Sequence, residues 1–196
     1  MGKQNFGNTA LVVIDMQKGI AGMQRKLEPH DAPTVIKNVA KLVKKFREEN
    51  LSVFLVHVTM KDGKDMLDPI VDGKPQMQTG ERPKDWAEFI DEIKPVESDI
   101  IIVKRQWGAF YGTELDLQLR RRKIDTIVLC GISTNIGVES TARSAYECGY
   151  NQIFAEDAMT AMGREEHESS IKFIFPRIGV VRNTEEVLNI IKDNIN

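Results

Sequence analysis

The chain has 196 residues, 41% of them hydrophobic, and its 27 basic and 29 acidic side chains leave a formal net charge of −2. This length predicts a single domain over residues 1–196, large enough to bury roughly 70% of its unfolded surface. The near-neutral balance argues against a nucleic-acid partner, because such proteins carry a concentrated basic surface. The short basic stretch 120–123 is better explained as the end of a helix.

The two cysteines and the absence of any apolar run near 18 residues predict a cytoplasmic protein without a membrane partner. Cys130 ends an apolar run and Cys148 precedes Gly149 at a helix end. Both are therefore expected to be small hydrophobic residues rather than reactive thiols.

The first predicted element is a strand over residues 10–14, because a continuous apolar run is typical of a parallel sheet covered on both faces. This strand ends at Asp15. The sequence leaves two roles open for Asp15: a cap of the following turn, or a general acid/base in a crevice. No Gly-x-Gly-x-x-Gly loop follows the strand, so dinucleotide binding is not expected.

The rest of the chain alternates predicted strands and helices. Strands are expected over residues 53–58, 100–103, 126–130, 152–155 and 178–181. Helices are expected around residues 33–46, over 86–93 before Pro95, over 113–121, from 138, from 164 to before Pro176, and after an Asn183 N-cap. This order predicts an α/β fold, a three-layer, doubly wound, Rossmann-like sheet of six mostly parallel strands.

Residues 61–83 are the least periodic part of the chain and hold several Gly and Pro residues. A loop of this length is usually a lid or a subunit contact, and surface disorder is the alternative. His57, in the strand before it, is expected to be a hydrogen-bonded core residue.

Lys104 follows the third strand and therefore lies at the same sheet edge as Asp15. The strand over 126–130 leads into Gly-Ile-Ser-Thr-Asn-Ile-Gly-Val at 131–138 and then into a segment with helical spacing. A strand, a turn and a helix start form the usual ligand crevice of an open α/β sheet.

These stretches resemble the isochorismatase-like (cysteine hydrolase) superfamily over residues 11–191. Residues 13–17 are similar to its first motif, whose Asp is the catalytic acid/base, and 104–113 to its second, whose Lys is catalytic. Residues 131–138 are similar to its signature, but Gly137 stands at the position of the nucleophilic cysteine, which the isochorismatase branch also lacks. The resemblance implies a cis peptide between Ile132 and Ser133, and a homodimer or larger homo-oligomer.

The expected site has Asp15 and Lys104 as catalytic residues and the backbone of Ser133 and Gly137 as oxyanion donors. Its expected pocket lining is Gln17, Trp107, Phe110, Tyr111, Thr134 and Asn135. In a crevice, burial raises the pKa of Asp15 and the Lys104 ammonium lowers it, and the sequence does not decide which effect is larger.

Without a thiol, a carboxyl group, an ammonium and backbone donors suit proton transfer and oxyanion stabilisation on a small-molecule substrate. That set fits vinyl ether hydrolysis, which the resemblance implies for the isochorismatase branch. Residues 133–135 and 139–143 instead resemble the amidase branch. Three hypotheses remain, in this order: an isochorismatase-like hydrolase, an inactive binding or assembly protein, and an amidase with a displaced nucleophile such as Ser133 or Thr134.

Nicotinamidases of the superfamily bind a metal through an Asp-x-His motif, for which this chain has Asp62-Gly63-Lys64. A lysine ammonium has no lone pair to give to a metal. No metal and no cofactor are therefore expected for this chain.

Overall fold

The computed structural model describes residues 8–23, 25–73 and 83–195. In this part of the chain six strands form one sheet in the order β3-β2-β1-β4-β5-β6, and each neighbouring pair runs parallel. The predicted α/β fold with a doubly wound parallel sheet is therefore confirmed. The strands are β1 (Thr9–Ile14), β2 (Val53–Val58), β3 (Ile100–Lys104), β4 (Thr126–Ile132), β5 (Asn151–Thr160) and β6 (Val180–Arg182).

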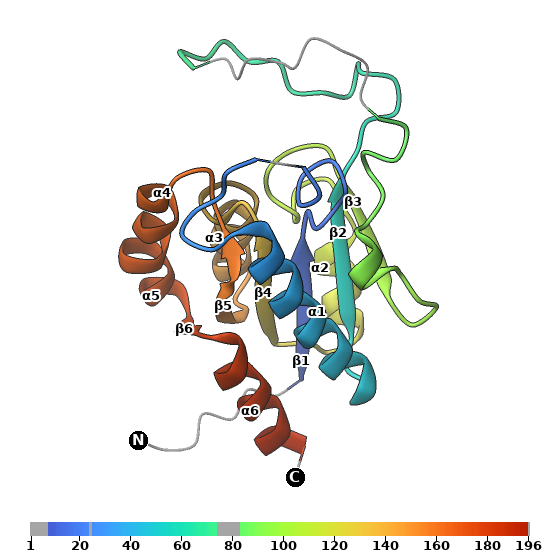
Figure 1. Cartoon of the computed structure of the whole chain (residues 1–196). Coiled ribbons are helices and arrows are strands. Elements are labelled where there is room, and N and C mark those ends of the chain that lie inside the picture. Colours follow the sequence, from blue (N-terminus) through green and yellow to red (C-terminus); the bar gives the residue numbers. More distant parts are fainter. Residues whose placement is uncertain (1–7, 24, 74–82, 196) are drawn as a thin grey trace.

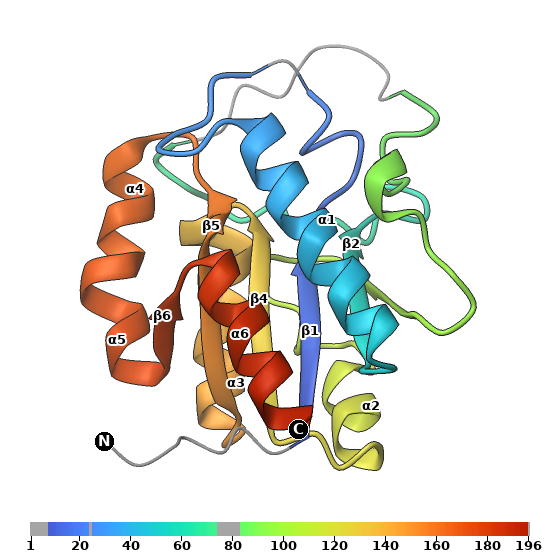
Figure 2. The same ribbon diagram turned by 60° about the horizontal axis from the view of Figure 1, so that its bottom comes forward.

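Helices cover both faces of this sheet (Figures 1 and 2). On one face lie α1 (Ala32–Glu48) and α6 (Thr184–Ile195), and on the other lie α2 (Leu115–Arg121), α3 (Glu139–Glu147) and α5 (Phe175–Ile178). Successive residues of β1 pack alternately into these two apolar layers, for example Val13 into the first and Val12 into the second. All residues of β1 and β4 are buried, which explains their continuous apolar runs.

Two strands continue at least two residues beyond their predicted ends. The prediction ended β4 at Cys130, but the strand continues through Gly131 to Ile132, and Gly131 pairs with Ile14 of β1. Gly131 has φ +118°, and a Cβ there would lie 2.0 Å from the Ile14 carbonyl oxygen. Glycine at this position therefore lets the strand continue rather than ending it.

The prediction ended β5 before Glu156, whereas the strand runs to Thr160. Its pairing with β4 shifts register between Leu129 and Gly131, which correspond to Phe154 and Met159. The polar residues Glu156 and Asp157, which the prediction placed after the strand, lie in this irregular segment, as extra residues do in a β-bulge.

The helix predicted over residues 86–93 is wrong. The segment has turns and a three-residue 3-10 helix, η1 (Asp91–Ile93), because several of its backbone groups bond to residues 16–19 rather than to a following helical turn. The carbonyls of Trp86 and Glu88 accept hydrogen bonds from Gly19 and Lys18, and Phe89 forms a bridge with Gln17.

The helix predicted to stop before Pro176 also continues. It runs through α4 (Arg164–Ser169) and the π-helical η3 (Ser170–Ile174) into α5. Pro176 lies at the start of α5, directly after the π-helical turn, where the hydrogen-bonding pattern of the helix changes.

Residues 61–73 form neither helix nor strand and extend away from the sheet (Figure 1). The rest of the predicted excursion, residues 74–82, lies outside the described residues. Among the described residues, no helix is both long and apolar enough to cross a bilayer.

Candidate active site

Two strand ends bring a buried ion pair together. Asp15 follows β1 and Lys104 is the last residue of β3, and both side chains are almost completely buried. The Asp15 Oδ2 atom lies 2.7 Å from the Lys104 Nζ atom, which also donates to the Trp107 carbonyl at 2.7 Å. The two residues therefore form one polar centre at the carboxyl edge of the sheet, where ligands of such folds bind.

The backbone turns sharply at Asp15 and directs its side chain into this centre. Asp15 has φ +52°, a conformation that few side chains other than Asp and Asn tolerate. Its N–H still donates to the Val56 carbonyl of β2 at 2.9 Å, so the residue remains tied to the sheet. The chain leaves the strand at this residue, which explains why the apolar run ends here.

Gly137 completes the centre. It lies in the π-helical turn η2 (Thr134–Val138), which joins β4 to α3, and the peptide bond between Ile132 and Ser133 is cis. A Cβ atom at Gly137 would lie 3.2 Å from Asp15 Oδ2 and 3.4 Å from Lys104 Nζ. The structure thus brings Asp15, Lys104 and Gly137 together. A Cβ would also lie 2.9 Å from the Ile14 Cγ2 atom, so this site is shaped around glycine.

Burial decides the protonation of Asp15. It raises the pKa of the carboxyl from 3.8 to about 6, while the charge and hydrogen bond of Lys104 and the nearby Val58 N–H lower it by less. The sequence did not decide whether burial or Lys104 has the larger effect on the pKa of Asp15, and in the structure the effect of burial is larger. Near neutral pH the group exchanges its proton readily, as a general acid/base does.

The two carboxyl oxygens of Asp15 have different surroundings. Oδ2 accepts from Lys104, whereas Oδ1 is buried and has no hydrogen-bond partner among the described residues. A buried carboxylate oxygen without a partner is costly, whereas a proton on it removes the charge. Oδ1 is the atom at which this site can hold a proton.

The residues predicted to line the pocket differ in their burial and in their contacts. Gln17 is buried and holds the end of β2, because its amide bonds the backbone of Val58 in both directions. Asn135 has a buried Oδ1 without a partner among the described residues. Phe110 packs against Tyr150 instead. The side chains of Trp107 and Tyr111 are mostly exposed.

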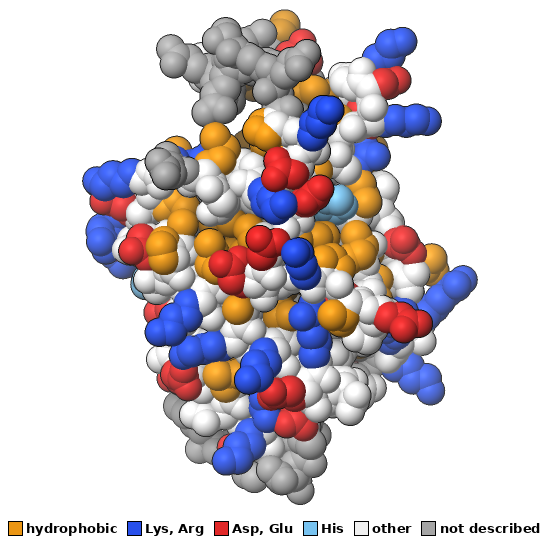
Figure 3. Space-filling model, turned by 45° about the vertical axis from the view of Figure 1, so that its right-hand side comes forward, with side chains coloured by type: hydrophobic (Ala, Val, Ile, Leu, Met, Phe, Trp, Pro, Cys, Tyr) orange, Lys and Arg blue, Asp and Glu red, His pale blue; other side chains and the backbone are white. Residues whose placement is uncertain are grey.

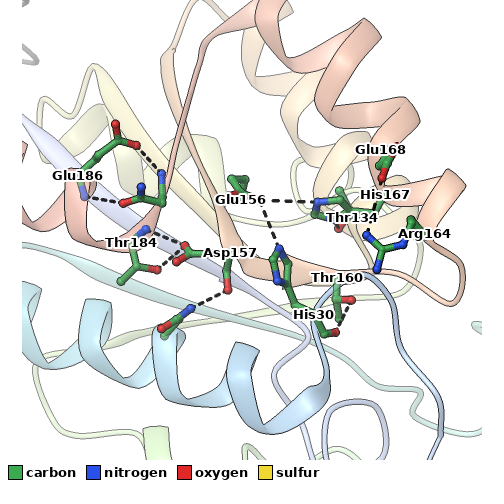
Figure 4. A network of polar contacts seen from close by, with 12 residues as sticks. His30, Thr134, Glu156, Asp157, Thr160, Arg164, His167, Glu168, Thr184 and Glu186 are labelled. Atoms are coloured by element: carbon green, nitrogen blue, oxygen red, sulfur yellow. Dashed lines mark hydrogen bonds and ion pairs between the residues drawn. The ribbon is translucent and has the colours of Figure 1, made fainter.

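Thr134 faces a second polar cluster (Figure 4). Its hydroxyl lies 2.9 Å from the His167 Nδ1 atom. The Nε2 atoms of His167 and His30 lie 3.9 Å and 3.3 Å from the same oxygen of Glu156, Oε2. Sequence reasoning missed this cluster because its residues come from three segments that only the fold brings together. The sequence offered one signal of this cluster: His167, one of only three histidines in the chain, is the fourth residue of α4.

Residues 9–186 match the family model described as the Isochorismatase domain. The chain belongs to the isochorismatase family. This family member is 54% identical over 188 residues to the isochorismatase family protein YwoC of Bacillus subtilis (strain 168), a match that covers 96% of each chain.

Two solved structures extend the family likeness. One is an isochorismatase family protein from Burkholderia thailandensis, with a TM-score of 0.88, 38% identity and coverage of 94% of this chain and 96% of that one. The other is N-carbamoylsarcosine amidase from Thermoplasma acidophilum, with a TM-score of 0.72, 29% identity and coverage of 91% and 98%. The chain is therefore a member of a family of hydrolases whose structures include an amidase.

Proposed function

We propose that this isochorismatase-family protein hydrolyses a small molecule by acid/base chemistry, without a covalent thiol intermediate, and that its substrate is a vinyl ether. The observation that carries the proposal is the Asp15 carboxyl. Lys104 occupies one of its oxygens, while the other is buried without a partner and the raised pKa favours a proton on it. A carboxylic acid with these properties is a proton donor.

In the first step, Asp15 would transfer its proton from Oδ1 to the terminal carbon of the vinyl ether double bond. The electron pair of that bond forms the new C–H bond, and the ether oxygen stabilises the resulting oxocarbenium ion. Lys104 would hold a carboxylate of the substrate. An ammonium has three N–H donors, and its contacts with Asp15 and Trp107 use two of them.

In the second step, water adds to the oxocarbenium carbon and returns a proton to the Asp15 carboxylate. The hemiketal then collapses to an alcohol and a keto acid. Gly137 supports this route because the residue nearest to Asp15 and Lys104 in the turn has no side chain of its own and offers no nucleophile. Backbone N–H groups of Ser133 and Gly137 would stabilise the negative charge that develops on the ether oxygen as its C–O bond breaks in this collapse.

An amide or carbamoyl substrate is the second candidate, favoured by the likeness to N-carbamoylsarcosine amidase. Covalent acyl transfer needs a nucleophile beside a base. The Thr134 hydroxyl does lie beside His167, but Thr134 is completely buried. This burial favours a structural role for the hydroxyl, so the amidase hypothesis stays behind the vinyl ether hypothesis.

A binding protein without catalysis is the third candidate. Burying an aspartate and a lysine together gives little net stability, because both charges lose their hydration. A protein that only binds or assembles gains little from keeping this pair. Its presence supports an enzyme.

The test is a hydrolase screen with isochorismate, nicotinamide and carbamoylated amines, each repeated on Asp15→Asn. We expect turnover of the vinyl ether substrate and a loss of about a hundredfold or more in Asp15→Asn, because the variant has no acidic proton to transfer. Turnover of carbamoylated amines alone would favour the amidase hypothesis. Vinyl ether turnover that survives in Asp15→Asn would refute the assigned role of Asp15.

A further inference from the structure

We propose that His30, Glu156 and His167 bind one divalent transition metal ion, with zinc as the best fit to their donor atoms. The three side chains come from the segment before α1, from β5 and from α4. One potential ligand atom of each lies within 4.8 Å of the others. This site is separate from the Asp15–Lys104 centre, and the proposal does not depend on the proposed reaction.

The side chains point toward one another as ligands of one ion would (Figure 4). His30 Nε2 lies 3.3 Å and His167 Nε2 3.9 Å from the same Glu156 oxygen, Oε2. In a tetrahedral site with normal zinc bond lengths, neighbouring ligand atoms are about 3.3 Å apart. The contact of His30 with Glu156 already has this spacing. To bind one ion, His167 would move closer to Glu156, and the two histidine ligand atoms, which lie within 4.8 Å of each other, would have to reach the same spacing.

The donor set is one that transition metals prefer. Two imidazoles and one carboxylate form a common three-ligand set for catalytic zinc and leave a fourth position open to water. Calcium and magnesium prefer oxygen ligands only, so two histidines argue against them. Arg164, on the same helix as His167, lies 3.8 Å from Glu168, which offsets part of its positive charge near the cluster.

The surrounding backbone holds His30 and Glu156 in place before any ion binds. The carbonyl of His30 accepts from the Thr160 hydroxyl at 2.7 Å, and Glu28 and Ala161 exchange both backbone hydrogen bonds. Glu156 lies in the irregular segment of β5. The next residue, Asp157, is fixed by Thr184 and Asn38. A preorganised cluster of this kind binds an ion without first paying for the ordering of loops.

Thr134 links the proposed metal site to the turn that holds Gly137. A metal-binding histidine normally hydrogen-bonds through its other ring nitrogen, which fixes the ring orientation. Here Thr134 Oγ1 lies 2.9 Å from His167 Nδ1, so Nε2 is left to face Glu156. Thr134 is the first residue of η2, and a metal ion would thereby fix one end of this turn.

The experiment uses the full chain, purified without a histidine tag and dialysed against a chelator. Zinc and cobalt(II) are titrated by calorimetry and by visible absorption, which reports four-coordinate cobalt. We expect one ion per chain, and at least about tenfold weaker binding in His30→Gln and in Glu156→Gln. The matched control is His57→Gln, because the chain has three histidines and His57 bonds to the Ala87 carbonyl outside the cluster.

Thermal unfolding provides a second readout that does not depend on activity. Zinc should raise the Tm of the wild type and of His57→Gln more than that of Glu156→Gln, because the stabilisation of the folded state grows with its affinity for the ion. Metal-free melting curves show whether each variant folds. An absence of saturable one-to-one binding in the wild type would overturn the proposal, and so would equal binding in the wild type and both cluster variants.

Discussion

The proton of the Asp15 carboxyl governs how activity should depend on pH. If Asp15 is the acid of vinyl ether hydrolysis, only its protonated form is active. Because its pKa lies at about 6, kcat/KM should fall about tenfold per pH unit above that value. The measurement is a pH profile of kcat/KM on the best substrate from the screen. Asp15→Asn is the control, because its residual activity should not fall in this way above pH 6. A rate that instead rises through pH 6 would identify Asp15 as a base.

The same pKa predicts a change in stability. The folded protein binds the Asp15 proton more tightly than the unfolded chain, so between pH 3.8 and about 6 the folded state holds more protons. The contribution of Asp15 to stability therefore falls as pH rises through this window and stays constant above it. A difference of about two pKa units corresponds to about 3 kcal/mol.

Urea denaturation of the wild type and Asp15→Asn at several pH values measures this effect as the difference between the two curves. Other carboxyls titrate in the same range, and the subtraction removes their contributions. Parallel curves for the two proteins between pH 4 and 6 would contradict the raised pKa.

Gly137 allows a test of whether the centre is built like that of a cysteine hydrolase. In Gly137→Cys the new thiol would lie beside Lys104 and near the start of a helix, which both favour the thiolate, whereas Asp15 opposes it. We expect iodoacetamide to modify it faster than Cys148, and faster than Cys130, which is buried and whose own thiol pKa is raised by that burial. Equal reaction rates at all three cysteines would count against a cysteine hydrolase site.

Crowding with Ile14 should destabilise this variant by about 1–3 kcal/mol, because the new Cβ lies 2.9 Å from a core methyl group. Gly137→Ala is the matched control, since it adds the same Cβ without a thiol. Comparing the two variants separates the loss of stability caused by the added Cβ atom from the effects of the thiol.

The individual site residues could be predicted from the sequence where they belong to a sequence motif. Asp15 and Lys104 follow apolar strands, and the structure joins them at 2.7 Å. The cluster of His30 and His167 had no motif, since the contact of His30 with Glu156 spans 126 positions in the chain. Such a contact depends on the whole fold and not on local spacing.

At the scale of elements, Thr141 connects the two segments that form the centre. Its hydroxyl donates to the Gly137 carbonyl at 2.7 Å and accepts from the Ala109 N–H at 3.1 Å. Thr141→Val keeps the shape of the side chain but leaves the buried Ala109 N–H without this acceptor. We expect a loss of about 1–3 kcal/mol and a lower kcat, because the segment after Lys104 is no longer tied to α3.

Thr141→Ser is the matched control, because it keeps both hydrogen bonds and loses only a methyl group. Chemical denaturation measures the difference in stability. If Thr141→Val is as stable as Thr141→Ser, the hydroxyl does not hold these elements together.

The predicted ends of elements failed where polar residues or special backbone residues stood inside an element. Gly131 looked like the stop of β4, yet glycine allows the close approach to β1 that a continuing strand needs. Glu156 looked like the end of β5, but a register shift keeps the strand paired beyond it. Pro176 was taken as a helix stop and lies instead in the first turn of α5. Local propensity does not distinguish these cases from true ends.

For the whole molecule, the alternation of strands and helices was sufficient to predict the sheet. Parallel neighbours need crossover connections, and right-handed crossovers place the connecting helices on the two faces of the sheet. Residues 61–83 could not be predicted in the same way, because their sequence has several Gly and Pro residues and no periodic apolar pattern. Their described part, residues 61–73, extends from the body (Figure 1).

This extended segment, together with the edge strand β3, supports the expected self-association. Leu67, Ile70 and Val71 are exposed on the segment, and Ile101 and Val103 are exposed on the edge strand β3. Figure 3 shows hydrophobic side chains gathered on the side of the molecule that carries β2 and β3. Exposed apolar patches of this kind mark interaction surfaces, and a symmetric pair of chains would cover the same patch on both.

We therefore expect a dimer or larger assembly in which Leu67 and Ile70 are buried against a second copy. Light scattering at micromolar concentration should give at least twice the mass of one chain for the wild type. The double variant Leu67→Asp/Ile70→Asp should shift toward the monomer, because a charge in an apolar contact loses its hydration. Phe173→Asp is the matched control, since Phe173 is also an exposed hydrophobic residue but lies in η3. A monomeric wild type would contradict the assembly, and a control that dissociates as readily as the double variant would place the contact elsewhere.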